Sequence, residues 1–276
     1  MCAECCAGNA NCPACRALLP TTDFPFDERA TLEELLTHAL RAYQREWQAC
    51  ALATLLYVMI VAGGSWLISI ASSLLVMAIT KWGNDETWLA WVYRGLPLVQ
   101  QLVLVPVQAL SSLGFMRMML DVVQGRSPAT GRFFGELRLM PRALLIQVPF
   151  TLVLSIPTTA TMVLSGVGSS AATGVSCLFL PLFLLFGLSW WLFSIPELVI
   201  SDCSALEAMQ RAWSLGSELR RFRVLGYAAL AGALLLAGVL ACFVGVFAGL
   251  PFGALLMLSL FLALRNSTSL PAPRSL

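Results

Sequence analysis

The sequence predicts an all-α membrane protein: a polytopic bundle of about six transmembrane helices in three hairpins, with short cytoplasmic amphipathic helices. Of the 276 residues, 58% are hydrophobic and 12% are charged, and the mean hydropathy is +0.81, whereas soluble proteins carry about 25% charged residues. Because a charged side chain is costly inside a bilayer, long stretches without one are typical of spanning helices. Five stretches lack Asp, Glu, Lys, Arg and His, namely 49–80, 96–116, 143–195, 224–249 and 250–264.

Residues 1–20 form a cysteine-rich segment. Cys2 and Cys5, and then Cys12 and Cys15, make two Cys-x-x-Cys pairs, which is the ligand spacing of tetrahedral zinc sites. The predicted topology places them in the cytoplasm, where thiols persist and disulfides are rare. We therefore expect these four cysteines to bind Zn²⁺, with Cys6 able to replace Cys5. The alternative is a cysteine-rich tail without a metal.

The second pair, in Cys12-Pro13-Ala14-Cys15 followed by Leu18-Leu19-Pro20, resembles the closing half of the zinc-ribbon modules that precede membrane domains in many bacterial proteins. Two features differ from those modules: Cys6 stands where glycine is usual, and only six residues separate the two pairs. The resemblance implies a small cytosolic interaction element. Residues 21–30, with several proline and acidic residues, then read as a linker to the membrane domain.

An amphipathic helix is predicted to begin at Thr31, where Thr31-Leu-Glu-Glu34 forms a capping box. Its charged side chains lie opposite an apolar face, and we expect that face to rest on the inner leaflet. The face consists of Leu32, Leu35, Leu36, Ala39, Tyr43 and Trp47. His38, the only histidine, falls on the polar side and is expected to be solvated. Capped segments at Ser127-Pro128 and Ser204-Ala-Leu-Glu207 precede the other two hairpins.

Six spans fit the apolar stretches, at about 49–78, 92–116, 143–166, 175–196, 224–247 and 250–265. The small and polar run 166–174 separates the third span from the fourth, and Pro251 separates the last two. As a helix, the first stretch would reach about 48 Å, against a hydrocarbon core of about 30 Å. It must tilt, protrude or break, and a kink is expected at Gly63-Gly64. The membrane domain covers 31–266, and 267–276 form a tail.

The basic residues predict the orientation. With both termini in the cytoplasm, 15 of the 17 lysine and arginine residues fall on inner segments, since only Lys81 and Arg94 lie outside. Lysine and arginine near span ends are retained in the cytoplasm. The small net charge of +2 and the lack of a basic run with aromatics give no reason to expect nucleic-acid binding.

Polar side chains recur at helical spacing within the spans. The candidates for a polar pathway, or for a pocket that holds a neutral ligand, are Gln101, Gln108, Gln147 and Thr151. The alternative is that such positions are packing seams, as is expected for the small-residue face Gly238, Cys242, Gly245 and Gly249. No carboxylate, lysine or histidine falls at mid-membrane depth, which argues against an ion-coupled carrier.

Charged residues at the inner span ends offer two further candidate sites. Anionic lipid headgroups attract each nearby basic residue by about 1 kcal/mol, and the residues placed to contact them are Arg220, Arg221 and Arg223. The alternative is that these arginines only set the topology. Glu197 and Asp202 could form an acid–base pair, or could be solvated or paired with arginines such as Arg211. No histidine lies near these groups, so a histidine-based triad or a zinc hydrolase is not predicted.

From about Thr31 to Arg265 the chain resembles the YciC-like families of bacterial integral-membrane domains and the membrane domain attached to glycerophosphoryl diester phosphodiesterases. The resemblance rests on Pro196-Glu197-Leu198-Val199, Glu207-Ala208-Met209, Arg211-Ala212-Trp213, Leu215-Gly216 and Gln124-Gly125-Arg126. It implies a six-helix bundle and an accessory role at the bacterial envelope. These residues include no phosphodiesterase domain, so that activity is not implied.

The sequence thus favours a non-enzymatic protein of the bacterial inner membrane, an accessory or scaffold protein with a cytosolic zinc-ribbon-like element. Its expected partners are membrane lipids and a cytosolic or membrane protein. Two alternatives stay open: a facilitator or binder of a neutral or lipid-like solute, and a lipid-acting membrane enzyme.

Overall fold

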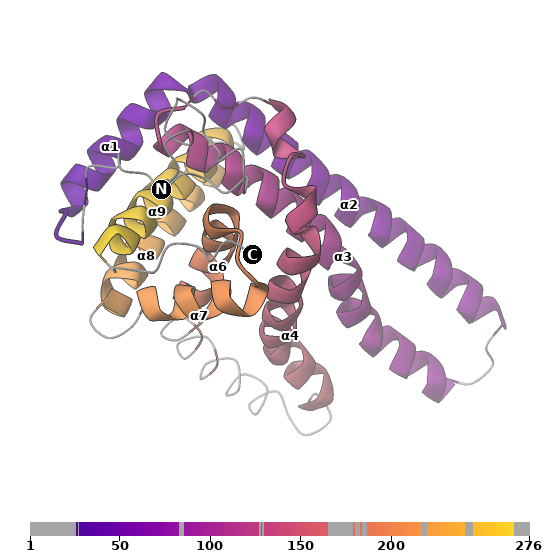
Figure 1. Ribbon diagram of the computed structural model, residues 1–276. Coiled ribbons are helices and arrows are strands. Elements are labelled where there is room, and N and C mark those ends of the chain that lie inside the picture. The colour runs from indigo at the N-terminus through magenta and orange to yellow at the C-terminus, as the bar shows by residue number, and fades with distance from the viewer. Residues whose placement is uncertain are drawn as a thin grey trace.

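The computed structural model describes residues 26, 28–82, 86–126, 128, 130–164, 179, 183, 187–216, 220–240 and 245–267. Across these residues the regular structure is helical, with no strand, which confirms the predicted all-α class. Five helices of this part of the chain, α2, α3, α4, α8 and α9, are long and apolar enough to cross a membrane, so this is a multi-pass membrane protein. Figure 1 shows α1 (Leu32–Arg45), α2 (Trp47–Trp82), α3 (Glu86–Val123), α4 (Met140–Leu164), α6 (Leu188–Ser201), α7 (Ala205–Leu215), α8 (Arg220–Leu240) and α9 (Val246–Ser267).

Helix α1 begins at the predicted capping box, with the Thr31 side chain and the Glu34 carboxylate each accepting a hydrogen bond from the other's backbone N–H. Its apolar face packs on the protein more than was expected, since Leu35 and Ala39 are buried in the core and α1 lies against α9. Trp47, at the end of the predicted face, is exposed. The expectation that His38 is solvated was wrong, because its ring is half-buried and makes an edge-to-face contact with Phe26.

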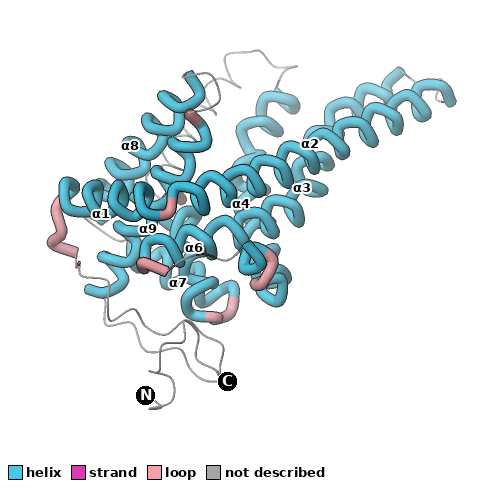
Figure 2. Tube along the Cα trace, turned by 90° about the horizontal axis from the view of Figure 1, so that it is seen from above, coloured by secondary structure: helices cyan, strands magenta, loops and turns pink. Residues whose placement is uncertain are grey.

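Helices α2 and α3 form the first hairpin. α2 runs without a break through Gly63 and Gly64, and its 36 residues reach about 54 Å. Gly64 lets α3 approach closely, because a Cβ there would lie 2.8 Å from a methyl carbon of Val107. Both views show the hairpin reaching beyond the other helices (Figures 1 and 2). Because the helix is unbroken, tilting and protrusion are the outcomes that its length still allows.

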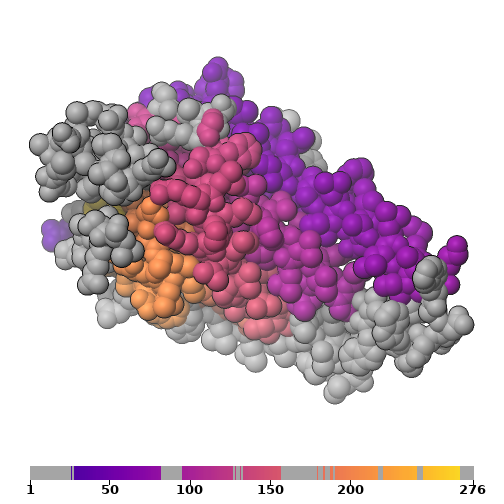
Figure 3. All heavy atoms as spheres, turned by 45° about the vertical axis from the view of Figure 1, so that its right-hand side comes forward, coloured from indigo at the N-terminus to yellow at the C-terminus, as the bar shows by residue number. Residues whose placement is uncertain are grey.

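Helices α4 and α6 belong to the second hairpin, and the predicted turn at 166–174 lies outside the described residues. Helix α6 continues past Pro196, where its span was expected to end, to Ser201. A proline is tolerated inside a membrane helix when neighbouring helices satisfy the freed backbone groups. Before α4, two 3-10 helices, Thr130–Phe133 and Leu137–Leu139, occupy the segment that follows Ser127-Pro128. Helix α7 lies against α6 and beside α4, on the face that Figure 3 shows.

Helices α8 and α9 form the third hairpin, whose turn differs from the prediction. Helix α8 ends at Leu240 and α9 begins at Val246, so Pro251 lies inside α9 rather than between the spans. Gly238 and Gly245 meet backbone to backbone, because a Cβ on Gly238 would lie 2.4 Å from the Gly245 carbonyl oxygen. Gly238, Gly245 and Gly249 of the predicted small-residue face therefore lie in the seam between these two helices rather than on one face of a single span, and Cys242 lies outside the described residues.

Helix α9 is at the centre of the bundle. It lies against α1, α2, α3 and α8, and every residue from Leu255 to Leu264 is buried, as expected for a helix that is apolar all round. Its end is bonded to the start of the described chain, since the Glu28 N–H donates to Ser267 Oγ over 2.8 Å. Residues 28 and 267 thus lie on the same side, so the chain between them crosses the membrane an even number of times. The described part of the chain has five helices long enough to cross and the shorter apolar helix α6, and a crossing that includes α6 would make the number even.

Candidate functional site

Arginines join the helix ends at one end of the bundle, which we name the inner end. Arg45, just before α2, donates to the Val122 carbonyl oxygen at the end of α3 over 3.0 Å. Arg142, at the start of α4, donates to the carbonyl oxygens of Asp202 and Cys203 just after α6, over 2.9 and 3.2 Å. A basic side chain at a helix C-terminus satisfies free carbonyls and interacts favourably with the helix dipole. Arg45 and Arg142, which the sequence assigned only a role in topology, therefore also join the two ends of the first and the second hairpin.

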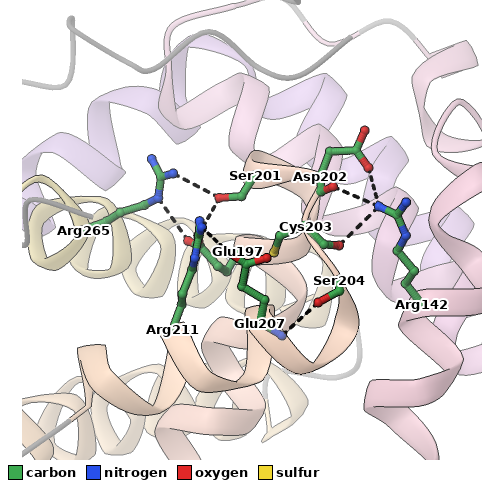
Figure 4. Close-up of polar contacts among 9 residues, drawn as sticks. All are labelled: Arg142, Glu197, Ser201, Asp202, Cys203, Ser204, Glu207, Arg211 and Arg265. Carbon is green, nitrogen blue, oxygen red and sulfur yellow. Dashed lines mark hydrogen bonds and ion pairs between the residues drawn. The ribbon is translucent and has the colours of Figure 1, made fainter. Parts of the chain in front are cut away.

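Glu197 is at the centre of the polar contacts at this end (Figure 4). Its side chain is fully buried. Its carboxylate accepts from Arg211 over 3.1 Å, from Arg265 over 3.0 Å and from the Ser201 hydroxyl over 2.5 Å. Arg211 also donates to Glu207 over 2.6 Å, and Arg265 to Ser201 over 3.1 Å. We call these five residues the Glu197 network. They join α6, α7 and α9.

The charges of the Glu197 network balance, with two glutamates and two arginines. Burial alone would lower the pKa of Arg211, but the hydrogen bond and charge of Glu197, with the charge of Glu207, raise it above its usual value. Arg211 thus stays a cation. A buried ion pair needs this geometry and additional hydrogen bonds to offset its desolvation.

Asp202 forms the turn between α6 and α7 with a left-handed backbone, at φ 47° and ψ 32°. Arg138 and Arg142 each hold its carboxylate, over 2.9 and 2.7 Å. Next to it, burial and then the nearby Glu197 raise the pKa of the Cys203 thiol to about 11. Glu197 and Asp202 are therefore each engaged by arginines of their own. Of the readings left open for them, the structure shows the pairing with arginine rather than solvation.

A cavity of about 320 Å³ lies between the helices, farther from the inner end. It is lined by residues of α2, α3, α4, α6, α8 and α9, none of them charged. Among the described lining residues, the side chains with polar atoms are those of Tyr57, Ser112, Gln147 and Trp191, whereas α8 and α9 contribute small and apolar residues such as Gly232. Gln147 is 6% exposed. Trp191 and Gly232 line the cavity and are also exposed on the bundle surface, so it opens on the flank between α6 and α8.

The structure separates the four residues predicted to form a polar pathway. Gln147 lines the cavity, whereas Gln101, Gln108 and Thr151 are half-buried and are not among its lining residues. Ser112, which shares the small polar face of α3, does line it. The sequence offered no reason to select Tyr57 as a candidate site residue, because a single aromatic residue in an apolar span does not stand out from the apolar residues around it. Only the structure shows that it lines the same cavity as Gln147.

The three arginines predicted to contact lipid headgroups are bonded within the protein. Arg220 pairs with the Glu28 carboxylate, and Arg223 donates to the carbonyl oxygens of Glu28 and Ala30. Arg221 donates to the Gly216 carbonyl oxygen over 3.0 Å and lies over the Trp213 ring at 5.3 Å. Their described contacts hold the segment before α1 and the end of α7.

The cysteines predicted to bind zinc, Cys2, Cys5, Cys12 and Cys15, lie outside the described residues, and zinc binding stays a prediction. In the part of the chain that the structure describes, no group of three or more histidine, cysteine, aspartate or glutamate side chains could hold a metal ion. No protein-family model matches the chain, and neither a curated protein nor a solved structure is significantly similar to it.

Proposed function

We propose that this integral membrane protein binds a neutral, lipid-like molecule in the cavity between α4, α6, α8 and α9, taking it up from the surrounding bilayer. The observation that carries the proposal is the cavity itself: its volume is about 320 Å³, it opens on the flank of the bundle, and its described lining residues carry no charge. Ligand pockets are typically apolar clefts with a few polar groups that fix orientation. Gln147, Ser112 and Tyr57 are such groups.

Binding is the chemistry that the lining supports best. Apart from two hydroxyl groups and one amide, the lining residues carry nothing that could serve as an acid, a base or a nucleophile. The ionisable groups of the inner end are engaged with one another, with Glu197 accepting three hydrogen bonds and lining no part of the cavity. This argues for a binding protein over a lipid-acting enzyme.

The test is to identify what the protein retains from its membrane. The protein is purified in mild detergent, bound lipid is extracted, and each species is quantified per mole of protein by mass spectrometry. Gly232→Leu places a side chain in open space at the cavity wall, and Gly226→Leu does the same on an exposed face of the same helix. A neutral species at near-equal stoichiometry in the wild type and in Gly226→Leu, but lost in Gly232→Leu, is expected. Equal retention in all three proteins would refute the proposal.

An accessory role through the cysteine-rich segment is the second candidate. One observation favours it: contacts of Arg220, Arg223 and Asn266 hold Phe26, Glu28 and Ala30 at the inner end, which places the start of the described chain at that end. Deletion of residues 1–20 should then remove bound zinc and any co-purifying protein partner, while the extracted lipid stays the same. Unchanged zinc and partners would exclude this role.

For the location, we propose the bacterial inner membrane with both termini in the cytoplasm. Fifteen of 17 basic residues on inner segments support this orientation, as does the hydrogen bond between Glu28 and Ser267, which keeps the two ends together. Reporter fusions at the two ends should both be active in the cytoplasm. Reporters active on opposite faces would contradict it.

A further inference from the structure

The polar groups of the cavity are not spread evenly along it. At about 1.5 Å per residue, Gln147 lies about 10 Å along α4 from Met140, and Ser112 about 16 Å along α3 from Val123. Tyr57 lies about 15 Å along α2 from its start. All three thus line the part of the cavity nearer the inner end.

The opposite part of the cavity is apolar. Leu235 lies about 22 Å along α8 from Arg220, and Leu250 about 26 Å along α9 from Ser267. Together with Leu188 these side chains line the portion that lies farthest from the inner end. The three polar side chains thus lie toward the inner end of the cavity, among apolar ones such as Met116 and Ile195, whereas the outer part is lined by apolar side chains such as Leu235 and Leu250. An amphiphile fits such a distribution.

The depth of the polar part restricts the chemistry of a bound head. The hydrocarbon core is about 30 Å thick, so a group beside Ser112 or Tyr57 lies near its middle. A charged group there needs a partner of opposite charge, and the lining residues supply none. The amide of Gln147 and the two hydroxyl groups can instead donate to and accept from an uncharged head.

The size of the cavity restricts the rest of the ligand. Its volume of about 320 Å³ lies at the lower end of the range of about 300–1,000 Å³ that is typical of small-molecule pockets. A diacyl lipid is much larger than the ligands that such pockets enclose. One chain of moderate length fills the space, and the flank opening by Trp191 and Gly232 lets a longer chain continue into the bilayer.

We infer that the ligand is a single-chain amphiphile with an uncharged hydrogen-bonding head, bound with the head at Gln147 and Ser112 and the chain directed toward Leu235 and Leu250. This inference rests on the proposed function and specifies the ligand class and its orientation. It separates such a ligand from a phospholipid, whose charged phosphate would have to stay outside the cavity.

The experiment compares two probes that differ only in the head. 1-Dodecanol and dodecyl phosphate, each with a photoreactive diazirine near the far end of the chain, are irradiated with the protein in phosphatidylcholine nanodiscs, and labelled peptides are mapped by mass spectrometry. The alcohol should label the part of α8 or α9 that contains Leu235 or Leu250, in competition with unlabelled dodecanol. Dodecyl phosphate should label these peptides at least about tenfold less. Gln147→Leu should reduce labelling by the alcohol about fivefold, the effect of one hydrogen bond.

Two glycine variants control for labelling from the bilayer. Gly232→Leu should abolish the competable label, and Gly226→Leu should leave it unchanged, because only the first adds a side chain at the cavity wall. Equal labelling by both probes would overturn the uncharged head, and labelling near Gln147 would overturn the orientation. Either result leaves the proposed function intact if Gly232→Leu still abolishes the label. No competable labelling by either probe, with no lipid retained on purification, would refute the proposed function itself.

Discussion

Glu197 illustrates how much a single buried side chain decides in this protein. In the sequence it is one carboxylate at the end of an apolar span, and its partners Arg211 and Arg265 lie 14 and 68 residues away. In the structure it joins three helices through hydrogen bonds to two arginines and a serine. Removing one partner of such a pair leaves an uncompensated charge in the interior.

We therefore expect Glu197→Gln to lower the free energy of unfolding by about 3–5 kcal/mol, the usual effect of breaking a buried ion pair. Glu207→Gln, in the same network but with a side chain that is 45% exposed, should cost less than about 1 kcal/mol. Thermal unfolding in detergent, followed by circular dichroism, measures both. Similar midpoints for the two variants would show that the buried network does not support the fold.

His38 predicts a dependence of stability on pH. Burial, and then the charges of Arg45 and Arg41, hold the pKa of His38 below its usual value of about 6.5. The folded protein therefore binds this proton less readily than the unfolded chain, and stability is lost as the pH falls below about 6.5. Hydrogen exchange of α1 should accelerate between pH 7.5 and pH 5.5, after correction for the intrinsic rate, and His38→Gln should remove this change. Acceleration that persists in His38→Gln would assign it to another group.

The seam between α8 and α9 is the clearest case of an element whose packing depends on glycine. A Cβ at Gly238 would lie 2.4 Å from the Gly245 carbonyl oxygen, and one at Gly249 would lie 2.8 Å from that of Leu234. Backbone atoms cannot move aside as a flexible side chain can, so the two helices must separate if a methyl group is added. Close approach through glycine is a common way to hold membrane helices together.

Gly238→Ala should therefore destabilise the protein by about 1–3 kcal/mol, the usual cost of overpacking. Gly226→Ala on the same helix meets open space and should be neutral or slightly stabilising, because alanine favours the helix. The two melting temperatures in the same detergent decide this. If Gly238→Ala melts with the wild type, the seam is looser than the contact distances indicate.

The prolines show where sequence reasoning about these helices fails. Pro97, Pro106, Pro196 and Pro251 all lie inside helices. Pro251 was expected to separate the last two spans, and the fourth span was expected to end at Pro196. Proline breaks helices in water because a freed carbonyl and a steric clash are costly. In a membrane bundle neighbouring helices satisfy the freed groups, so the same residue is no longer a reliable boundary.

At the inner end, the first and last described segments of the chain lie together and are hydrogen-bonded. Arg220 and Arg223 of α8 and Asn266 and Ser267 of α9 all bond to residues 26–30. Figure 2 shows α1 beside α9 in this region. The contacts connect residues more than 190 positions apart, so they form only when the helices between them are in place.

Arg223→Ala should release this segment without unfolding the bundle, because its guanidinium group holds two of the carbonyl oxygens there. Amide exchange of residues 28–31 is expected to rise about tenfold or more, as one to two hydrogen bonds are lost. The neighbouring Arg221→Ala removes a contact with Gly216 and should leave that exchange unchanged. Equal protection in both variants would mean that Arg223 does not hold the segment.

The solvent, the helical class and five of the apolar spans were readable from the residues alone, because a bilayer excludes charge and so marks its helices by composition. The capping residues of α1 and α7 were readable for a similar reason, since their hydrogen bonds are local. The residues alone did not reveal the partners of Glu197 or the internal contacts of Arg220 and Arg223. They also did not show that Gln147, rather than Gln101, lines the cavity. Those depend on which helices become neighbours, and contacts between distant segments leave no periodic trace in a sequence. The packing of the helices also created a cavity whose polar side chains Gln147, Ser112 and Tyr57 lie toward one end.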